Sequence, residues 1–251
     1  MNFTYFLPFC KSKSAATEDL MGQVEKNLML NLYPLLITLS TAGNLANLAV
    51  YRHEFLRSST TIRTLAAKAV ANTLSLYCVL PNYLKSIPQL TNNPSINWFY
   101  WNSLPYTMFN TNTFATFAIW LTVIMSLERY LLVAFPIRSR NWCTMRNTYT
   151  AMILTFLGSI CLQIPTILAR QLFSAECLNN ESQSIKIYAY TVPRKYRQLE
   201  NTYYYLYSLM TIIMPMLILA STTLSINYHL FWSRKKLTCG GNVNGASMEQ
   251  K

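Results

Sequence analysis

Charged residues are scarce in this sequence, and long stretches contain none. They make up 12% of the 251 residues, about half of the share in a typical soluble domain. About 20 consecutive apolar residues cross the hydrocarbon core of a bilayer as a helix. The scarcity of charge therefore predicts an all-α membrane protein rather than a soluble domain. The charge-free stretches are residues 27–51, 69–84, 86–127, 147–169 and 201–233.

Acidic residues are the rarer charged type: nine Asp and Glu oppose 21 Lys and Arg, giving a net charge of +12. The cations lie in short groups between the charge-free stretches, and no single basic stripe forms. This distribution is typical of the positive-inside rule and argues against a nucleic-acid partner. It predicts a multi-pass protein of the plasma membrane, with an extracellular N-terminus, a cytoplasmic C-terminus and the lipid bilayer around it.

Motifs for catalysis and metal binding are missing. The six cysteines show no C-x-x-C spacing, and the two histidines, His53 and His229, form no H-E-x-x-H motif. Paired catalytic aspartates and a nucleophile elbow are absent too. We therefore expect no enzyme activity, no metal and no cofactor. The first ten residues also lack the basic start of a cleavable signal peptide, so the first span would target the chain.

The predicted fold is a bundle of five transmembrane helices over residues 27–233. An extracellular tail (residues 1–26) precedes it, and a polar cytoplasmic tail (residues 234–251) follows it. Two sequons, at Asn2 and Asn180, fall on the extracellular side and predict N-glycosylation there. The expected spans are residues 28–51, 64–85, 103–133, 147–169 and 202–233.

Polar residues and prolines within the spans indicate how the helices meet. Asn44 and Asn72 need hydrogen-bond partners at membrane depth, so we expect them at helix contacts. Gly43 would allow a neighbouring helix to approach closely. Pro165 and Pro215 are expected to shape the fourth and fifth spans.

The third span ends in Glu128-Arg129-Tyr130, where a charge-free stretch meets a basic segment. These residues resemble the Asp/Glu-Arg-Tyr motif of rhodopsin-like (class A) G protein-coupled receptors. The resemblance extends to Gly43-Asn44, to the run 65–74 with Asn72 in place of an aspartate, and to both prolines. Residues 136–144 resemble the second inner loop of invertebrate FMRFamide-like neuropeptide receptors.

The resemblance implies a receptor that binds an extracellular peptide ligand and activates a heterotrimeric G protein, with receptor oligomers as a further form. Arg129 would then be the G protein-facing switch, Glu128 its intrahelical partner and Tyr130 a packing neighbour. Asn72 lacks the charge of the family's aspartate, so no sodium site is expected. The ligand pocket would include Thr111, Asn112 and Ala115, although hydrogen bonding between helices explains these polar positions equally well.

The sequence also departs from this receptor pattern. It contains no sixth or seventh span, so it would correspond to helices one to five, truncated after the fifth. Leu104 stands where the family has a cysteine, which leaves Cys177 to stay free or to pair with Cys10. Two alternatives remain: a truncated non-signalling isoform that modulates full-length receptors, and a transporter fragment.

Overall fold

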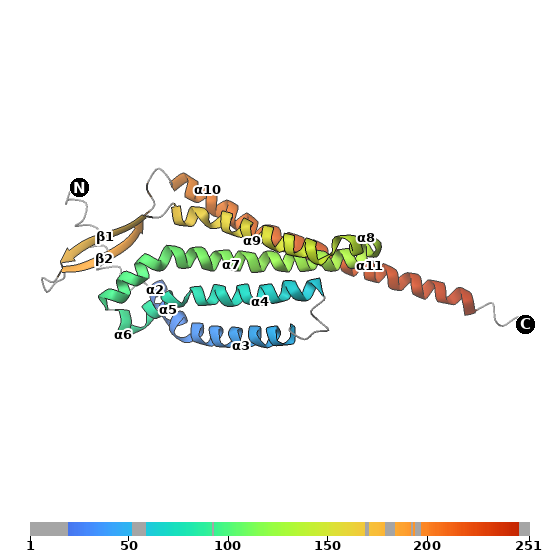
Figure 1. Cartoon of the computed structure of the whole chain (residues 1–251), viewed down its shortest axis with the longest axis horizontal. Coiled ribbons are helices and arrows are strands. Elements are labelled where there is room, and N and C mark those ends of the chain that lie inside the picture. Colours follow the sequence, from blue (N-terminus) through green and yellow to red (C-terminus); the bar gives the residue numbers. More distant parts are fainter. Residues whose placement is uncertain are drawn as a thin grey trace, which may run out of the picture.

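A computed structural model describes residues 20–51, 59–91, 93–168, 171–178, 184–191, 193 and 197–245, the side chains of residues 20, 21, 23, 91, 171, 173–178, 184–191 and 233–245 excepted. The described part is an elongated helical bundle with one β-hairpin (Figure 1). Its elements up to α7 are α2 (Leu20–Asn27), η2 (Leu28–Leu32), α3 (Tyr33–Tyr51), α4 (Thr60–Cys78), α5 (Leu80–Ser86), α6 (Pro88–Thr91) and α7 (Pro94–Ala134). The elements that follow are α8 (Pro136–Trp142), α9 (Met145–Leu168), β1 (Gln171–Leu178), β2 (Ser184–Thr191), α10 (Arg197–Ser208), η5 (Leu209–Ile213) and α11 (Met214–Gly245).

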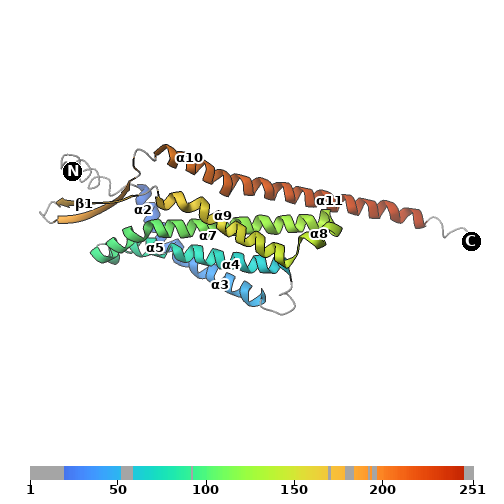
Figure 2. The ribbon, with the colours of Figure 1, turned by 45° about the horizontal axis from the view of Figure 1, so that its top comes forward.

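Helix α7 is the centre of the bundle. Its 41 residues make a helix about 62 Å long at 1.5 Å per residue. It packs against α4, α9 and α11, and α3 packs on the far side of α4 (Figures 1 and 2). Most of the buried apolar side chains belong to α7, among them Ala118, Leu121, Val123 and Met125. Helices α4, α9 and α11 are therefore positioned by α7, and α3 is positioned by α4.

The outer faces of the helices are apolar. Large hydrophobic side chains such as Leu39, Leu154 and Leu217 are more than 60% exposed, which suits lipid as a solvent and not water. Four helices in the described part are long and apolar enough to cross a membrane: Val24–Tyr51, Pro94–Ala134, Met145–Leu168 and Arg197–Trp232. The prediction of a helical membrane protein is thus confirmed for four of the five expected spans.

The second expected span, residues 64–85, is helical but broken. Helix α4 ends at Cys78, and α5 starts at Leu80 after a turn at Val79. Pro81 causes the break, because it has no N–H to donate to the carbonyl one turn earlier and its ring crowds that carbonyl. Lys68, Asn72 and the threonines also make α4 less hydrophobic than the four helices that are apolar enough to cross a membrane.

The segment between the second and third expected spans, residues 86–102, is largely helical. Helix α7 begins at Pro94, well before the expected residue 103. Proline suits the first helical position, and the Asn93 side chain caps it by accepting a hydrogen bond from the Ser95 N–H at 3.0 Å. On the preceding turns, Lys85 donates to the Asn97 side chain at 2.7 Å. These local contacts extend the helix that the hydrophobic pattern placed further along.

Two five-residue π-helical turns occur in the same sequence context. Segment η2 ends just before Tyr33-Pro34, and η5 ends just before Met214-Pro215. In each case the residue before the proline donates its N–H five positions back, Tyr33 to Leu28 and Met214 to Leu209. A wider turn relieves the clash between the proline ring and the carbonyl four residues earlier. Pro215 therefore shapes its helix, as expected, by widening the turn that precedes it.

Both ends of the bundle carry an extension. Strands β1 and β2 form an antiparallel hairpin, with Gln171 opposite Thr191 and Leu178 opposite Ser184, in a segment expected to be a plain loop. At the other end α11 continues past α8 to Gly245, beyond the expected end of the fifth span at residue 233 (Figures 1 and 2). The first residues of the expected N-terminal tail to be described, 20–26, are helical as well.

Candidate functional site

Glu128 is the most tightly held charged side chain at one end of the bundle, here called the Glu128 end, where α7 ends and α4 and α9 begin. It is 7% exposed. Thr148 of α9 donates to its Oε1 at 2.9 Å, and Thr61 of α4 donates to its Oε2 at 3.4 Å. Each carboxylate oxygen thus has a hydroxyl donor from a different helix. The carboxylate joins α7 to both neighbours.

Arg129 lies beside Glu128 in sequence but not in space. It is exposed, and within the described residues it has no hydrogen bond or ion pair. Successive residues of an α-helix point about 100° apart, so adjacent side chains do not face each other. The structure therefore contradicts the expected intrahelical Glu128–Arg129 pair: threonines hold Glu128, and the guanidinium is available to another molecule.

Tyr130 and Ser126 connect the same end of α7 to α11. The Tyr130 ring lies 6.3 Å from the His229 ring and 6.2 Å from the Phe135 ring, centroid to centroid. One turn earlier, the Ser126 and Thr222 hydroxyls are 2.7 Å apart. Together with Glu128, these contacts mean that α7 touches α4, α9 and α11 within about one turn of Arg129.

Cys143 lies close to the Glu128 end, outside the spanning helices, and its thiol senses the charge of Glu128. It lies in the short connection between α8 and α9 and is half-buried. Burial raises the pKa of its thiol above the ordinary value, and the negative charge of Glu128 raises that pKa further. The electrostatic influence of Glu128 thus reaches this connecting segment.

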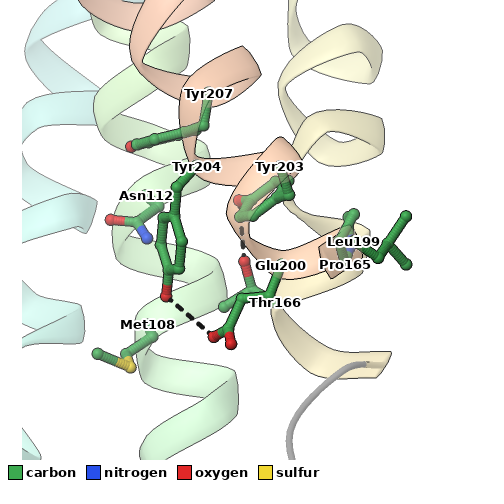
Figure 3. Close-up of a pocket in the computed structure, with 9 residues that line it drawn as sticks. All are labelled: Met108, Asn112, Pro165, Thr166, Leu199, Glu200, Tyr203, Tyr204 and Tyr207. Carbon is green, nitrogen blue, oxygen red and sulfur yellow. Dashed lines mark hydrogen bonds between the residues drawn. The ribbon is translucent and has the colours of Figure 1, made fainter. Parts of the chain in front are cut away.

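At the opposite end, here called the Glu200 end, a small cavity lies between α7, α9 and α10 (Figure 3). Its volume is about 60 Å³, well below the ~300 Å³ of a pocket that encloses a whole ligand. The space admits a few water molecules or the tip of one side chain. Its lining residues are Met108, Asn112, Pro165, Thr166, Leu199, Glu200, Tyr203, Tyr204 and Tyr207.

A hydrogen-bond network supports the wall of this cavity. Tyr203 of α10 donates to the Gln163 carbonyl oxygen at 3.0 Å, and its hydroxyl is 3.0 Å from that of Thr166. Gln163 is fully buried, and its amide nitrogen has no hydrogen-bond partner. Tyr203 therefore ties α10 to α9 through two buried groups.

The cavity combines one carboxylate with aromatic rings. Tyr204 donates to Glu200 Oε1 at 3.4 Å, as Figure 3 shows. The Tyr203 ring lies 5.6 Å from that of Tyr204 and 5.9 Å from that of Tyr207, centroid to centroid. A negative group beside the faces of tyrosine rings attracts cations.

The three predicted pocket residues do not lie at one site in the structure. Asn112 lines the cavity, whereas Ala115 lines a separate groove beside α4. Thr111 contributes its backbone, which accepts a hydrogen bond from Ser75 at 3.1 Å. Glu200 was not predicted as a pocket residue, because it lies one residue before the charge-free stretch 201–233 and the candidates were polar residues within such stretches. Its position four residues before Tyr204, on the same helix face, is the feature that could have identified it.

The other predicted site residues lie at or near helix contacts or outside the described residues. Asn44 of α3 donates to Thr73 of α4 at 2.9 Å, Asn72 lines the groove beside α4, and Pro165 lines the cavity. The sequons at Asn2 and Asn180 and the thiol of Cys10 fall outside the described residues, as does the side chain of Cys177. Their glycosylation and disulfide pairing stay predictions.

A helical bundle with four helices long and apolar enough to cross a bilayer is the architecture of a multi-pass membrane protein. Residues 31–239 match the sequence model of the serpentine type 7TM GPCR chemoreceptor Srw family, so the chain belongs to that family. The chain is therefore a G protein-coupled receptor sequence and not an enzyme. The prediction of a G protein-coupled receptor is confirmed, but the family shown is Srw; it is neither the rhodopsin-like (class A) assignment nor the FMRFamide-receptor-like group that residues 136–144 suggested.

Relatives in Caenorhabditis elegans agree with this family. The chain is 27% identical over 138 residues to the protein named "Putative G-protein coupled receptor F59B2.13", and this match covers 54% of the chain. It is 28% identical over 141 residues to the protein named "Probable G-protein coupled receptor B0563.6", and that match covers 55% of the chain. In each case the match spans 32% of the relative's length. The chain thus matches about a third of either protein.

Proposed function

We propose that this chain transmits the binding of an extracellular ligand at the Glu200 end to a G protein at the Glu128 end. The observation that carries the proposal is the placement of Asn112 and Arg129 on one helix. Asn112 lines the cavity, and Arg129 is exposed without a partner in the described residues. They are 17 residues apart, or about 26 Å along α7, close to the thickness of a bilayer core.

The orientation follows from charge. Arg138, Arg140 and Arg146 are exposed near the Glu128 end, and cations near span ends favour the cytoplasm. At the Glu200 end the exposed aromatics Trp98 and Tyr106 suit a membrane interface. The N-terminus is then extracellular and the C-terminus cytoplasmic in a five-span bundle, with α4 as the span that lies between α3 and α7. The plasma membrane is the expected location.

The ligand that suits the cavity presents one cationic side chain. The space of about 60 Å³ admits a side-chain tip, and Glu200 with the rings of Tyr203, Tyr204 and Tyr207 favours a positive group. A neuropeptide with an exposed arginine or lysine meets this requirement, with the rest of the peptide outside the cavity. Thr111 and Ala115 then act through helix packing, and Asn112 contacts the ligand.

Signalling requires the free guanidinium of Arg129. A G protein that offers carbonyl or carboxylate acceptors would bind it directly, with no internal ion pair to break first. Glu128 holds α4, α7 and α9 together beneath it through Thr61 and Thr148. Tyr130 positions α11 through its contact with His229.

The test expresses the full chain with an N-terminal epitope tag and applies a panel of synthetic amidated peptides with or without arginine. Surface staining of intact cells measures orientation, and calcium and cyclic AMP measure signalling. We expect a response to arginine-containing peptides that Arg129→Ala abolishes and that the exposed-cation control Arg146→Ala preserves. A cytoplasmic tag, or surface expression without a response to any peptide, would refute signalling by this chain alone.

A second function is association with a complete receptor, without signalling of its own. One observation favours it: two polar side chains in a groove beside α4, those of Lys68 and Asn72, have no partner among the described residues. This function predicts no response to any peptide in cells that express the chain alone. It also predicts an altered surface level of a co-expressed full-length Srw receptor.

A further inference from the structure

The cavity of Figure 3 places three hydrogen-bond acceptors around one aromatic ring. Glu200 and Tyr207 belong to α10, and Asn112 belongs to α7. Tyr204 lies four residues after Glu200 and three before Tyr207, so these three side chains share one face of α10. The cavity is thus a polar site built around the Tyr204 ring, and its walls are helices that the structure describes.

These acceptors are largely unused within the described residues. The Tyr204 hydroxyl donates to Glu200 Oε1 over a long 3.4 Å, and Oε2 has no partner there. Neither the Asn112 amide nor the Tyr207 hydroxyl makes a hydrogen bond in the described part of the chain. A group that brings several donors into the cavity would therefore meet free acceptors on two helices.

The rings that frame the site are fixed in orientation. The Tyr203 ring stacks on that of Tyr207, with centroids 5.9 Å apart and planes 30° apart. The Tyr203 hydroxyl is anchored by the buried side chain of Gln163. Planar cations stack on the faces of aromatic rings. A flat cation therefore suits this frame better than a compact one.

Arginine and lysine would use such a site differently. The guanidinium of arginine is planar and carries five N–H donors in a fixed fork, whereas the ammonium of lysine is a compact charge with three donors. A guanidinium over the Tyr204 ring can meet Glu200 with one edge and Asn112 with the other. An ammonium that pairs with Glu200 leaves Asn112 without a partner.

Asn112 is therefore the residue that can distinguish the two cations. Its amide lies beside the Tyr204 ring in Figure 3, with the nitrogen on the near side. A half turn about the terminal bond exchanges nitrogen and oxygen, and Oδ1 then accepts from a guanidinium N–H. The side chain is half-buried, so water competes less for this hydrogen bond than it does at an exposed site.

We propose that this cavity selects an arginine over a lysine side chain, with Glu200 binding the charge and Asn112 determining the selectivity. Selection of this kind rests on the proposed function, since the ligand must enter at the Glu200 end. The arginine contacts both α10 and α7, whereas a lysine contacts α10 alone. Helix α7 also carries Arg129, so arginine is the cation that engages the helix reaching the opposite end of the bundle.

The experiment measures binding alone, with the full chain in phosphatidylcholine nanodiscs near neutral pH. The probes are the N-acetyl amides of arginine, lysine and citrulline, which is neutral and has nearly the shape of arginine. Saturation-transfer NMR gives a dissociation constant for each probe. We expect arginine to bind about tenfold more tightly than lysine, because lysine lacks one hydrogen bond between a charged group and its acceptor. Citrulline should bind most weakly.

Two variants separate the contacts. Asn112→Leu should weaken the arginine probe about tenfold and leave the lysine probe unchanged, and unchanged lysine binding also shows that the variant is folded. Glu200→Gln should weaken both cationic probes and leave citrulline unchanged. Asn110→Leu is the matched control, because Asn110 is exposed outside the cavity lining and two residues along a helix point to nearly opposite sides. It should bind all three probes like the unmodified chain.

Other results would overturn the proposal. Equal affinity for arginine and lysine would refute selection, as would loss of the preference in Asn110→Leu. Weaker binding of both cations in Asn112→Leu would show that Asn112 only shapes the cavity. If arginine and lysine bind equally and both depend on Glu200, the cation site of the proposed function stands and only the selectivity fails. If neither cation binds, that ligand site fails as well. Calcium and cyclic AMP play no part in these measurements, so a chain that does not signal can still pass the test.

Discussion

Thr148 donates a hydrogen bond of 2.9 Å to Glu128 across the α7–α9 interface, and this buried contact replaces the ion pair with Arg129. Thr148 is itself 5% exposed. The carboxylate is thus satisfied by a neutral donor from another helix, and Arg129 keeps its full charge for an external partner.

Replacing Thr148 by Val should destabilise the bundle. The change keeps the shape of the side chain but leaves Oε1 of a buried carboxylate without its donor, which costs about 1–3 kcal/mol. Thr61→Val should cost less, because its contact with Oε2 is longer at 3.4 Å. Thermal unfolding in detergent measures both variants. Thr150→Val is the matched control, since Thr150 is exposed and bonds only to its own helix, and an equal loss there would contradict the argument.

The Cys143 thiol should react faster when Glu128 is made neutral. Glu128→Gln removes one of the two causes that raise the Cys143 pKa, so that pKa falls and a larger fraction of the thiol is ionised at neutral pH. The thiolate is the reactive form, and its larger fraction outweighs the small loss of nucleophilicity. Maleimide labelling measured against pH should shift to lower pH. Burial still raises the pKa, so the curve should stay above that of a free thiol. A curve that does not move would show that the Glu128 charge does not act on Cys143.

The hydrophobic pattern predicted the long helices because lipid-facing helices need only length and apolarity, and both can be read from residues 27–51, 147–169 and 201–233. It did not predict the helix that starts at Pro94. That start depends on the Asn93 cap, a local contact with no effect on hydropathy. The break at Val79 was missed although Pro81 marked it.

Side-chain pairing was harder to predict. Glu128 and Arg129 are adjacent in sequence, which suggested a pair, but helix geometry turns them apart and brings Thr148 from another helix into contact. Gly43 was expected to allow close helix approach, yet a Cβ added there would meet no atom within 4 Å. Such contacts depend on how the helices are rotated about their axes, and apolar surfaces on all sides leave that rotation undetermined in the sequence.

Pro215→Ala should remove the π-helical turn and disturb the cavity. With an N–H restored at this position, the helix can return to regular i→i−4 bonding, and losing one residue from a turn rotates the preceding segment by about 100°. Tyr203 and Tyr207 precede that turn and line the cavity, so they would leave its wall. Pro34→Ala removes the same element from α3, away from the cavity, and serves as control. Distances between spin labels on α10 and α9 should change in Pro215→Ala only, and unchanged distances there would refute the link.

Tyr203→Phe should lower stability through Gln163. The substitution keeps the ring contacts with Tyr204 and Tyr207 but removes the hydroxyl that donates to the Gln163 carbonyl oxygen and lies beside Thr166. Gln163 is fully buried and already has an amide nitrogen without a partner, so losing this donor costs about 1–3 kcal/mol. Thermal unfolding should show the loss, and hydrogen exchange should rise in α10, which Tyr203 ties to α9. Tyr205→Phe is the control, because Tyr205 is 79% exposed. If both variants unfold at the same temperature as the unmodified chain, the network contributes nothing to the attachment of α10.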